Sequence, residues 1–344
     1  MKATNAPYNI SDLSESVDRM KAILDASDGA FEEKDSIPPA ESLTYDNGFY
    51  VKCSALFIDI RGSSTLPDKH TRPVLAKIYR SYISEAVAVM NSNPNCREVV
   101  IKGDCVSAIL DTPYTTGINT AFESAAKLNS LVNVLNWQLE KKSYTPIRCG
   151  IGLAWGRALM LKAGFKGSGI NDIVWMGDVV NEASKLCGRG NKLSNAAVQV
   201  SADARHNLND QYKTFLTAKY DTELNEYRYE GNVIETNMEK WLEEQKEKER
   251  RNQALAQALA RTGLFGGLPA PRRPLGLLAR NMHVPPVTPF SPQSGSTSLR
   301  SIAGLGTRPF LLSGAARDPF PSAPKDGMWE AWSALSASGY LPKR

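Results

Sequence analysis

The feature that most constrains this chain is a pair of short apolar runs that each end at an aspartate. The run at 55–58 leads into Asp59, and the run at 99–101 leads through a Lys-Gly pair into Asp104. Short apolar runs bounded by turn residues are typical of buried strands. Two carboxylates delivered by neighbouring strands can hold divalent cations. The sequence therefore predicts a sheet that carries a metal site at the ends of these strands.

The pattern around the two runs alternates in the order strand, helix, strand, strand, helix, strand. The predicted elements are a strand at about 50–60, a helix at 71–91, strands at 97–102 and 105–110, a helix at 116–141 and a strand at 146–155. This order is the split βαβ arrangement of ferredoxin-like folds (βαββαβ). We therefore expect an α+β domain with an antiparallel-rich sheet and flanking helices.

Further elements are predicted after a hairpin at Trp155-Gly156. They are a strand at 157–163, a Gly-rich loop at 164–171, a strand at 172–176, a helix from Gly177 to Cys187, a strand at 197–201, a helix at 202–208 and a strand near 224–230.

Composition divides the chain into four segments. They are an N-terminal helix and linker (1–48), the α+β domain (49–236), a charged helix (237–251) and a tail (252–344). The tail holds 12 of the 20 prolines and is basic, and such a composition without periodicity is typical of disorder. The amphipathic helix at 9–25 either packs on its own domain or contacts a second subunit, and both interpretations stay open.

The distribution of charge and the dispersed positions of the cysteines and histidines exclude several classes of protein. The net charge of +5 comes from the tail, because residues 1–251 carry 31 Lys and Arg against 33 Asp and Glu. The folded part lacks a basic patch with aromatics, so no nucleic-acid partner is expected. The five cysteines and three histidines are dispersed, which favours neither a zinc site nor a nucleophilic triad. No apolar run is long enough for a membrane segment, so the expected compartment is the cytoplasm.

The turn that follows Asp59 is suited to phosphate. Gly62, Ser63 and Ser64 stand between the strand and the next helix. Backbone amides at such a turn and serine hydroxyls donate hydrogen bonds to phosphate oxygens. Together with two carboxylates for hard cations, the turn predicts two-metal phosphoryl chemistry on a triphosphate.

Three blocks of the sequence resemble the signature blocks of class III nucleotidyl cyclases. They lie at 57–64 (FIDIRGSS), 101–104 (IKGD) and 175–185 (WMGDVVNEASK), and the resemblance spans roughly residues 50–232. It implies two Mg²⁺ or Mn²⁺ ions per active site, held by Asp59, Asp104 and the carbonyl of Ile60. It also implies a head-to-tail homodimer with the active sites at the interface.

The same resemblance implies roles for the third block. Asn181 of one subunit would orient the ribose in the site of the other. Lys185 stands where the family usually has an arginine that stabilises the transition state. Lysine supplies the positive charge without the bidentate fork of arginine, and Arg189, one helical turn further on, is a candidate to assist.

The positions that read the base depart from both purine patterns of the family. Adenylyl cyclases have Lys and Asp there, and guanylyl cyclases Glu and Cys, whereas this chain has Val100 and Val174. In this departure and in size the chain resembles the bacterial anti-phage Pycsar cyclases, which make cyclic pyrimidine nucleotides. Arg97 is the candidate base reader, because a guanidinium suits the O4 carbonyl of uracil and would face an amino donor in cytosine. Tyr50 is expected to pack against that arginine or the base.

An alternative for Arg97 is a solvated charge at the strand end. Strand alternation places Val100, and not Arg97, on the face of Asp104 unless the strand bends.

The expected function is conversion of UTP, in preference to CTP, into the 3′,5′-cyclic monophosphate and pyrophosphate. The resemblance further implies a role in phage defence, with a separate effector that binds the cyclic nucleotide. Two alternatives stay open. One is an adenylyl cyclase with atypical base recognition, for which Lys102 is near the strand end. The other is a catalytically silent regulatory module, which retention of Asp59 and Asp104 opposes and Lys185 mildly favours.

Overall fold

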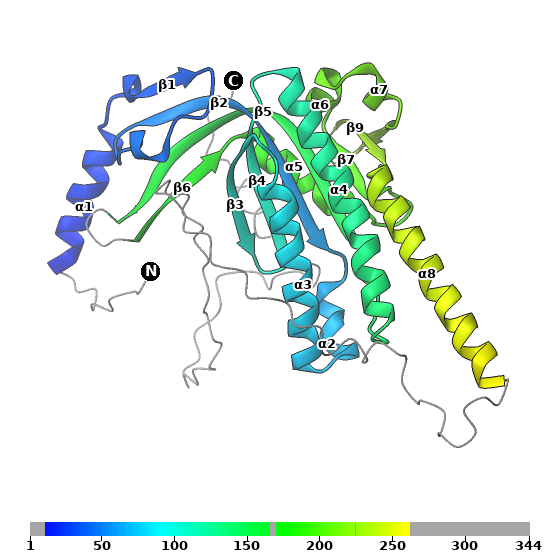
Figure 1. Ribbon diagram of the computed structural model, residues 1–344. Coiled ribbons are helices and arrows are strands. Elements are labelled where there is room, and N and C mark those ends of the chain that lie inside the picture. The colour runs from blue at the N-terminus through cyan, green and yellow to red at the C-terminus, as the bar shows by residue number, and fades with distance from the viewer. Residues whose placement is uncertain (1–10, 166–169, 224, 262–344) are drawn as a thin grey trace, which may run out of the picture. The chain divides into compact units, whose positions relative to one another are not determined.

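A computed structural model describes residues 11–165, 170–223 and 225–261 (Figure 1). Its helices are α1 (Ser11–Leu24), α2 (Leu66–Lys69), α3 (Arg72–Asn91), α4 (Thr115–Glu140), α5 (Asp178–Arg189), α6 (Ala202–Asn207), α7 (Asp210–Lys213) and α8 (Thr236–Arg261). Its strands are β1 (Phe31–Lys34), β2 (Gly48–Ile60), β3 (Cys96–Lys102), β4 (Cys105–Asp111), β5 (Cys149–Phe165), β6 (Ile170–Met176), β7 (Val198–Val200), β8 (Thr217–Asp221) and β9 (Glu226–Gly231). Short 3₁₀ helices lie at Asp28–Ala30, Ala40–Ser42 and Ser63–Thr65.

The described strands form one sheet whose centre is the predicted ferredoxin-like core. The strand order is β3-β4-β2-β5-β7-β9-β8, and β1 and β6 pair with β2 and β5 outside this path. The core strands β3, β4, β2 and β5 are all antiparallel to their neighbours. Since α3 and α4 make the two crossovers, the predicted α+β class and βαββαβ order are confirmed.

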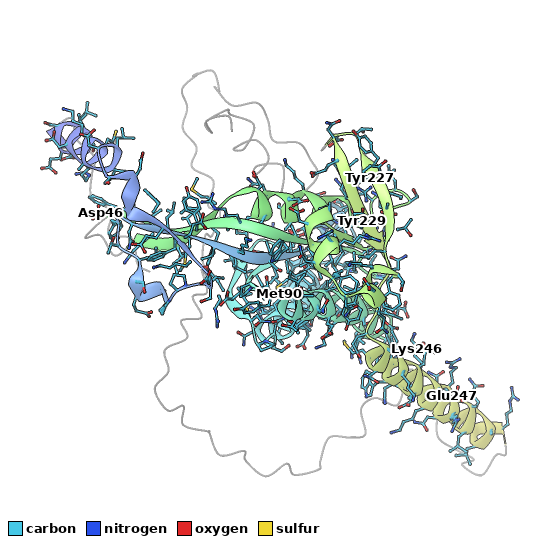
Figure 2. All side chains as sticks on the ribbon, turned by 90° about the horizontal axis from the view of Figure 1, so that it is seen from above. Asp46, Met90, Tyr227, Tyr229, Lys246 and Glu247 are labelled. Carbon is cyan, nitrogen blue, oxygen red and sulfur yellow. The ribbon has the colours of Figure 1, made fainter. Side chains whose placement is uncertain are left out.

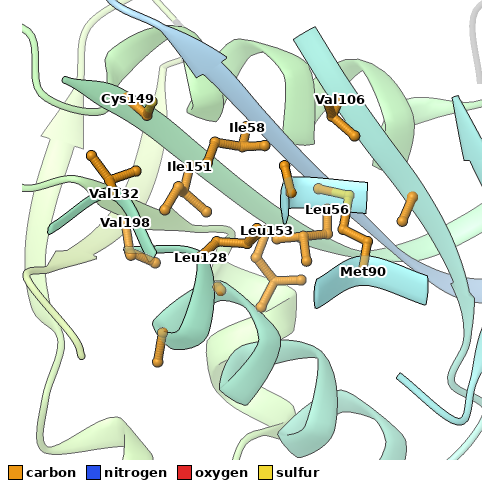
Figure 3. Close-up of a cluster of buried hydrophobic side chains, with 14 of the residues drawn as sticks. Leu56, Ile58, Met90, Val106, Leu128, Val132, Cys149, Ile151, Leu153 and Val198 are labelled. Carbon is orange, nitrogen blue, oxygen red and sulfur yellow. The ribbon is translucent and has the colours of Figure 1, made fainter. Parts of the chain in front are cut away.

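Helices α3 and α4 cover one face of this core (Figure 1). Alternate residues of β2, namely Leu56, Ile58 and Ile60, belong to the cluster of buried side chains beneath these helices. Leu56 and Ile58 are labelled in this cluster in Figure 3. The intervening Ala55 and Phe57 belong to a second cluster on the opposite face. Side chains alternate between the two faces of a strand, so Asp59 projects toward that second face.

Helix α5 packs directly on the backbone of β5 on the second face. A Cβ atom added at Gly152 would lie 2.1 Å from the carbonyl oxygen of Ala183 and 2.3 Å from the amide nitrogen of Cys187. Only glycine permits this approach, which explains the alternating glycines at the start of β5. The close packing brings the C-terminal end of α5 beside the end of β2, where Arg61 Nη1 donates to the Gly188 carbonyl over 3.4 Å.

Several segments differ from the sequence prediction, and α7 and β8 are among the elements that it did not include. The predicted hairpin at Trp155-Gly156 is wrong, because β5 runs without interruption from Cys149 to Phe165 and pairs with β2 from Cys149 to Leu161. Gly156 is a strand residue that faces Val179 of α5, and a Cβ atom added there would lie 3.5 Å from the Val179 Cβ, which is an ordinary contact. The glycine therefore forms no turn, and the packing of α5 does not require it. The predicted linker contains a short strand, β1, which pairs with the start of β2. Residues 166–169 of the predicted Gly-rich loop lie outside the described residues.

Helix α1 confirms the predicted N-terminal helix, and its apolar residues are not covered by the single chain. Leu13, Val17, Met20 and Leu24 are all exposed. A contact to its own domain comes from Arg19, whose guanidinium lies 4.9 Å from the ring centroid of Phe165. Within the described ranges, no helix is long and apolar enough to cross a membrane.

The described chain divides into two compact units near residue 238. The second unit includes α8 from Glu239 onward, and ion pairs three or four residues apart line this helix. Lys246 and Glu247, two of the paired residues, are labelled in Figure 2. The helix continues to Arg261 and does not end at Arg251, because Ala and Leu, which are strong helix formers, dominate the extra turns. The predicted tail from residue 262 onward lies outside the described residues.

Candidate active site

Asp59 and Asp104 come together as the sequence predicts. Ile58 of β2 pairs with Val106 of β4, and the turn between β3 and β4 carries Asp104. Burial of Asp59 and, next in size, repulsion from Asp104 raise the pKa of Asp59 to about 7. Asp104 Oδ2 is buried and accepts no hydrogen bond from any described residue. A buried carboxylate, Asp59, and a half-buried one, Asp104, thus lie within reach of each other, and Asp104 has an unsatisfied buried oxygen.

Arg61 supplies the counter-charge, a role that the sequence alone did not reveal. Its Nη2 donates to Asp59 Oδ2 over 2.9 Å, and the two side chains are only 7% and 12% exposed. The same nitrogen also donates to the Asp59 carbonyl oxygen over 3.3 Å. The available signal was the position of Arg61 inside the first sequence block, two residues after the aspartate.

The donor set fits a divalent cation. One cationic group, Arg61, contacts Asp59, while the buried Asp104 Oδ2 still needs a positive partner. In the described part of the chain, no three His, Cys, Asp or Glu side chains converge into a larger metal-binding group. Other ligands would come from the carbonyl of Ile60, substrate oxygens and water, a mixture that suits Mg²⁺.

The predicted phosphate turn lines a pocket of about 260 Å³. Gly62 has a left-handed backbone (φ 66°) and precedes the 3₁₀ helix that carries Ser63 and Ser64. The lining residues are Asp59, Ile60, Arg61, Gly62, Ser63, Ser64, Arg148, Asn191, Lys192 and Leu193. Three of them are cationic and two carry hydroxyls, so the pocket is suited to an anion.

Sequence reasoning did not find Arg148 and Lys192. Arg148 immediately precedes β5, and its carbonyl accepts a hydrogen bond from the Arg61 amide over 2.7 Å. Lys192 follows α5, and its positive charge acts to lower the pKa of Asp59. Neither residue lies in a recognised block, and only the tertiary fold brings them to the phosphate turn.

Asn181 and Lys185 lie on α5 and are not among the described residues that line this pocket. Lys185 interacts with Glu182 and with Glu226, at the start of β9, and lowers the pKa of each against the stronger effect of their burial. Strand β9 lies toward the β8 edge of the sheet, whereas Asp104 lies toward the β3 edge. One chain therefore does not bring Lys185 together with the two carboxylates.

Arg97 lies at a β-bulge, since the register with β4 shifts between Cys96 and Glu98. The strand end thus departs from regular alternation there, which is the bend that a base-reading role for Arg97 requires. The guanidinium donates to Asp111 Oδ2 over 2.9 Å, and the side chain is 47% exposed.

Tyr50 does not stack on Arg97. The guanidinium of Arg157, on the neighbouring strand β5, lies 3.6 Å from the Tyr50 ring centroid. Within the single chain, strand pairing places a different arginine beside the ring than the one expected. Packing of Tyr50 against the base stays a prediction.

Glu98, two residues before Val100, and Trp175, directly after Val174, form an unpredicted polar contact. Trp175 Nε1 donates to the carboxylate of Glu98. Burial raises the pKa of Glu98, and the tryptophan hydrogen bond opposes that rise.

Comparison with known proteins finds relatives that are named as cyclases. No protein-family model matches the chain. A uridylate cyclase from Gulbenkiania mobilis is 40% identical over 252 residues, which cover 68% of this chain and 97% of that protein. A uridylate cyclase from Treponema porcinum is 36% identical over 212 residues, which cover 61% of this chain and 74% of that protein.

Among solved structures, the adenylyl cyclase CyaB from P. aeruginosa aligns with a TM-score of 0.47 and 18% identity, over 55% of this chain and 96% of that one. The identity to the Gulbenkiania protein extends over nearly the whole of that relative. This chain belongs to the uridylate cyclase family and is a nucleotidyl cyclase.

Proposed function

We propose that this protein converts UTP, in preference to CTP, into the 3′,5′-cyclic monophosphate and pyrophosphate with the help of two divalent cations. The observation that carries the proposal is the meeting of Asp59 and Asp104 beside the phosphate turn. The names of the two relatives support the choice of UTP.

Asp59, Asp104 and the carbonyl of Ile60 would hold Mg²⁺ or Mn²⁺. When bound, such ions make the ribose 3′-hydroxyl a better nucleophile and neutralise charge on the triphosphate. The 3′-oxygen forms a bond to the α-phosphorus, the bond from that phosphorus to the bridging oxygen breaks, and pyrophosphate leaves with the electron pair. The 3′-hydroxyl proton goes to solvent. The amides of the Gly62 turn, the hydroxyls of Ser63 and Ser64, and the guanidinium of Arg148 bind phosphate oxygens and fix the line of attack.

The complete site combines two subunits of a homodimer. Asn181 and Lys185 belong to the proposed machinery, yet the single chain holds Lys185 near Glu226 and away from Asp104. A second copy supplies these two residues, with Asn181 orienting the ribose and Lys185 carrying positive charge to the transition state. Arg189 does not assist, because it is bound to Asp221 over 2.8 Å and to Glu223.

Complementation tests the shared site. Mixed dimers of Asp104→Asn and Asn181→Ala chains contain one intact site, so mixing two inactive preparations is expected to restore activity. If the site were built from one chain, the mixture would stay inactive.

Arg97 and Tyr50 are proposed to read the pyrimidine. The bulge at Arg97 supports this assignment, and the apolar Val100 and Val174 leave both purine-reading positions without polar groups. The product is proposed to be a cytoplasmic signal for a separate effector in phage defence, a role that rests on the family resemblance.

A panel of four triphosphates tests the reaction. The full chain is incubated with UTP, CTP, ATP or GTP and Mn²⁺, and products are identified by mass spectrometry. We expect cyclic UMP, lost in Asp59→Asn and Asp104→Asn and kept in Asp210→Asn, whose side chain is fully exposed. Cyclic AMP as the main product would favour the adenylyl cyclase alternative, and no product from any triphosphate would favour the regulatory module.

A further inference from the structure

The turn after α5 has a strained backbone where it lines the phosphate pocket. Asn191 (φ 54°) and Leu193 (φ 50°) both adopt the left-handed conformation, although neither is glycine. The left-handed region costs an L-residue with a Cβ roughly 1–2 kcal/mol. Such strain persists where surrounding contacts impose it, and it concentrates at ligand sites. Lys192 stands between these two residues.

Hydrogen bonds hold this turn from two sides. Asn191 Nδ2 donates to the Cys149 carbonyl over 2.8 Å, which ties the turn to the start of β5. Asn195 Nδ2 donates to the Arg189 carbonyl over 3.1 Å, which closes the turn onto the end of α5. The turn is therefore held in a fixed position relative to the start of β5.

A buried ionic cluster on the β8–β9 hairpin anchors the other end of the turn. Asn195 Oδ1 accepts hydrogen bonds from Arg228 Nη2 over 3.3 Å and from Lys219 Nζ over 3.1 Å. Arg228 is 6% exposed and forms ion pairs with Asp221 over 3.2 Å and with Glu230 over 2.9 Å. Because its charge is fully paired inside the protein, Arg228 is a rigid support for Asn195.

Lys192 is thereby held at a pocket that already contains a phosphate-binding turn. It lines the same pocket of about 260 Å³ as Ser63 and Ser64. Asp59 lines this pocket as well, so Lys192 shares it with one of the carboxylates proposed to hold the metal. A flexible lysine on a fixed turn can follow a phosphate group as charge builds on it.

We propose that Lys192 binds the phosphate groups that leave as pyrophosphate, and that Asn195 and Arg228 are positioning residues that hold its turn against the pocket. The proposal rests on the proposed cyclase function for the identity of the ligand. It assigns the β8–β9 hairpin, which is remote in sequence from all three cyclase blocks, a part in substrate binding.

Binding of inorganic tripolyphosphate to the full chain in the presence of Mg²⁺ tests the role of Lys192 without catalysis. A hydrogen bond to a charged group contributes about 1.5–3 kcal/mol, so Lys192→Ala is expected to raise the Kd by about tenfold or more. Lys192→Arg is expected to restore most of the affinity. Lys213→Ala is the matched control, because Lys213 pairs with an exposed aspartate on the surface of α7. An unchanged Kd in Lys192→Ala would overturn the proposal.

A double-mutant cycle tests the positioning role. Asn195→Ala is expected to weaken tripolyphosphate binding when Lys192 is present and to have no further effect in the Lys192→Ala background. Equal effects in both backgrounds would show that Asn195 acts independently of Lys192. The cycle uses Asn195→Ala because loss of Arg228 leaves buried carboxylates without a partner and threatens folding.

The two proposals can fail separately. Tripolyphosphate binding that depends on Lys192, in a protein that makes no cyclic nucleotide, would keep this inference and reject the cyclase reaction. Cyclase activity whose KM for UTP is unaffected by Lys192→Ala would keep the cyclase reaction and reject this inference.

Discussion

Arg61 and Asp59 form an ion pair that is almost completely buried at the end of β2, with Nη2 2.9 Å from Oδ2. The pair lies where the proposed metal ligands meet, so the chain carries one permanent positive charge beside two carboxylates. Arg61 therefore stabilises the folded protein before any divalent cation binds.

Removing this counter-charge is expected to destabilise the protein. Breaking a buried ion pair by deleting one partner costs about 3–5 kcal/mol, because the other charge is left uncompensated. We expect Arg61→Met to lower the free energy of unfolding by about this amount in urea titrations without divalent cations. Arg251→Met is the control, because Arg251 and its partner Glu247 are both exposed and surface pairs contribute about 0–1 kcal/mol. A loss in Arg61→Met no larger than in the control would contradict the assignment.

The repulsion between Asp59 and Asp104 predicts opposite effects of mutation with and without metal. Asp104→Asn removes the repulsion, so the metal-free variant is expected to melt at the same temperature as the wild type or a few degrees higher. Mn²⁺ is expected to raise the melting temperature of the wild type, because a ligand that binds only the folded state stabilises it. The Asp104→Asn variant should lose most of this rise, whereas Asp210→Asn should keep it. An equal rise in Asp104→Asn would place the cation elsewhere.

The raised pKa of Glu182 predicts that the free energy of unfolding falls as pH rises. Burial, and then the charges of Glu226, Asp203 and Asp178, raise its pKa from 4.5 to about 8. Between these values the folded state binds more protons than the unfolded state, so stability is full below pH 4.5 and falls up to about pH 8.

The measurement is urea unfolding at several pH values from 5 to 8. Glu182→Gln is expected to remove a downward slope of at most about 1.4 kcal/mol per pH unit. Glu41→Gln is the control, because it alters an exposed carboxylate. A slope that persists in Glu182→Gln would assign the dependence to other groups.

Replacing Leu193 with glycine is expected to increase the stability of the protein. Its side chain is fully exposed and its backbone is left-handed, so Leu193→Gly relieves strain without losing packing. The greater chain entropy of glycine in the unfolded state offsets part of the gain, so the net increase is expected to be below about 1 kcal/mol. Leu193→Ala keeps the strained backbone and serves as the control in thermal unfolding. A lower melting temperature in the glycine variant than in the alanine variant would show that Leu193 makes a stabilising contact.

A substitution at Arg97 distinguishes a role in base recognition from a purely structural role. If it reads the base, Arg97→Gln is expected to lower kcat/KM for UTP by about tenfold or more and to narrow the preference over CTP. If it only neutralises Asp111, the variant is expected to lose stability and leave that preference unchanged. Arg80→Gln, on the exposed side of α3, is the control for the loss of a positive charge.

The central fold and the two carboxylates proposed to hold metal were predictable because they depend on local pattern. The apolar runs before Asp59 and Asp104 predict strands that each end at an acidic residue, and their order with two amphipathic helices predicts the ferredoxin-like core. The errors came from local signals with two meanings. A glycine between two apolar runs indicates a turn, but Gly156 lies inside the continuous strand β5.

The sequence by itself determined the class of fold, the pair Asp59 and Asp104, the phosphate turn and the resemblance to nucleotidyl cyclases. Only the tertiary structure decided that Arg61 compensates Asp59, that Lys192 joins Ser63 at the pocket, and that Lys185 interacts with Glu226 and does not line that pocket. The physical reason is that strand and turn formation depend on neighbours in sequence, whereas ion pairing and pocket lining depend on distances through space. Those distances are fixed when the sheet closes and α5 packs on β5.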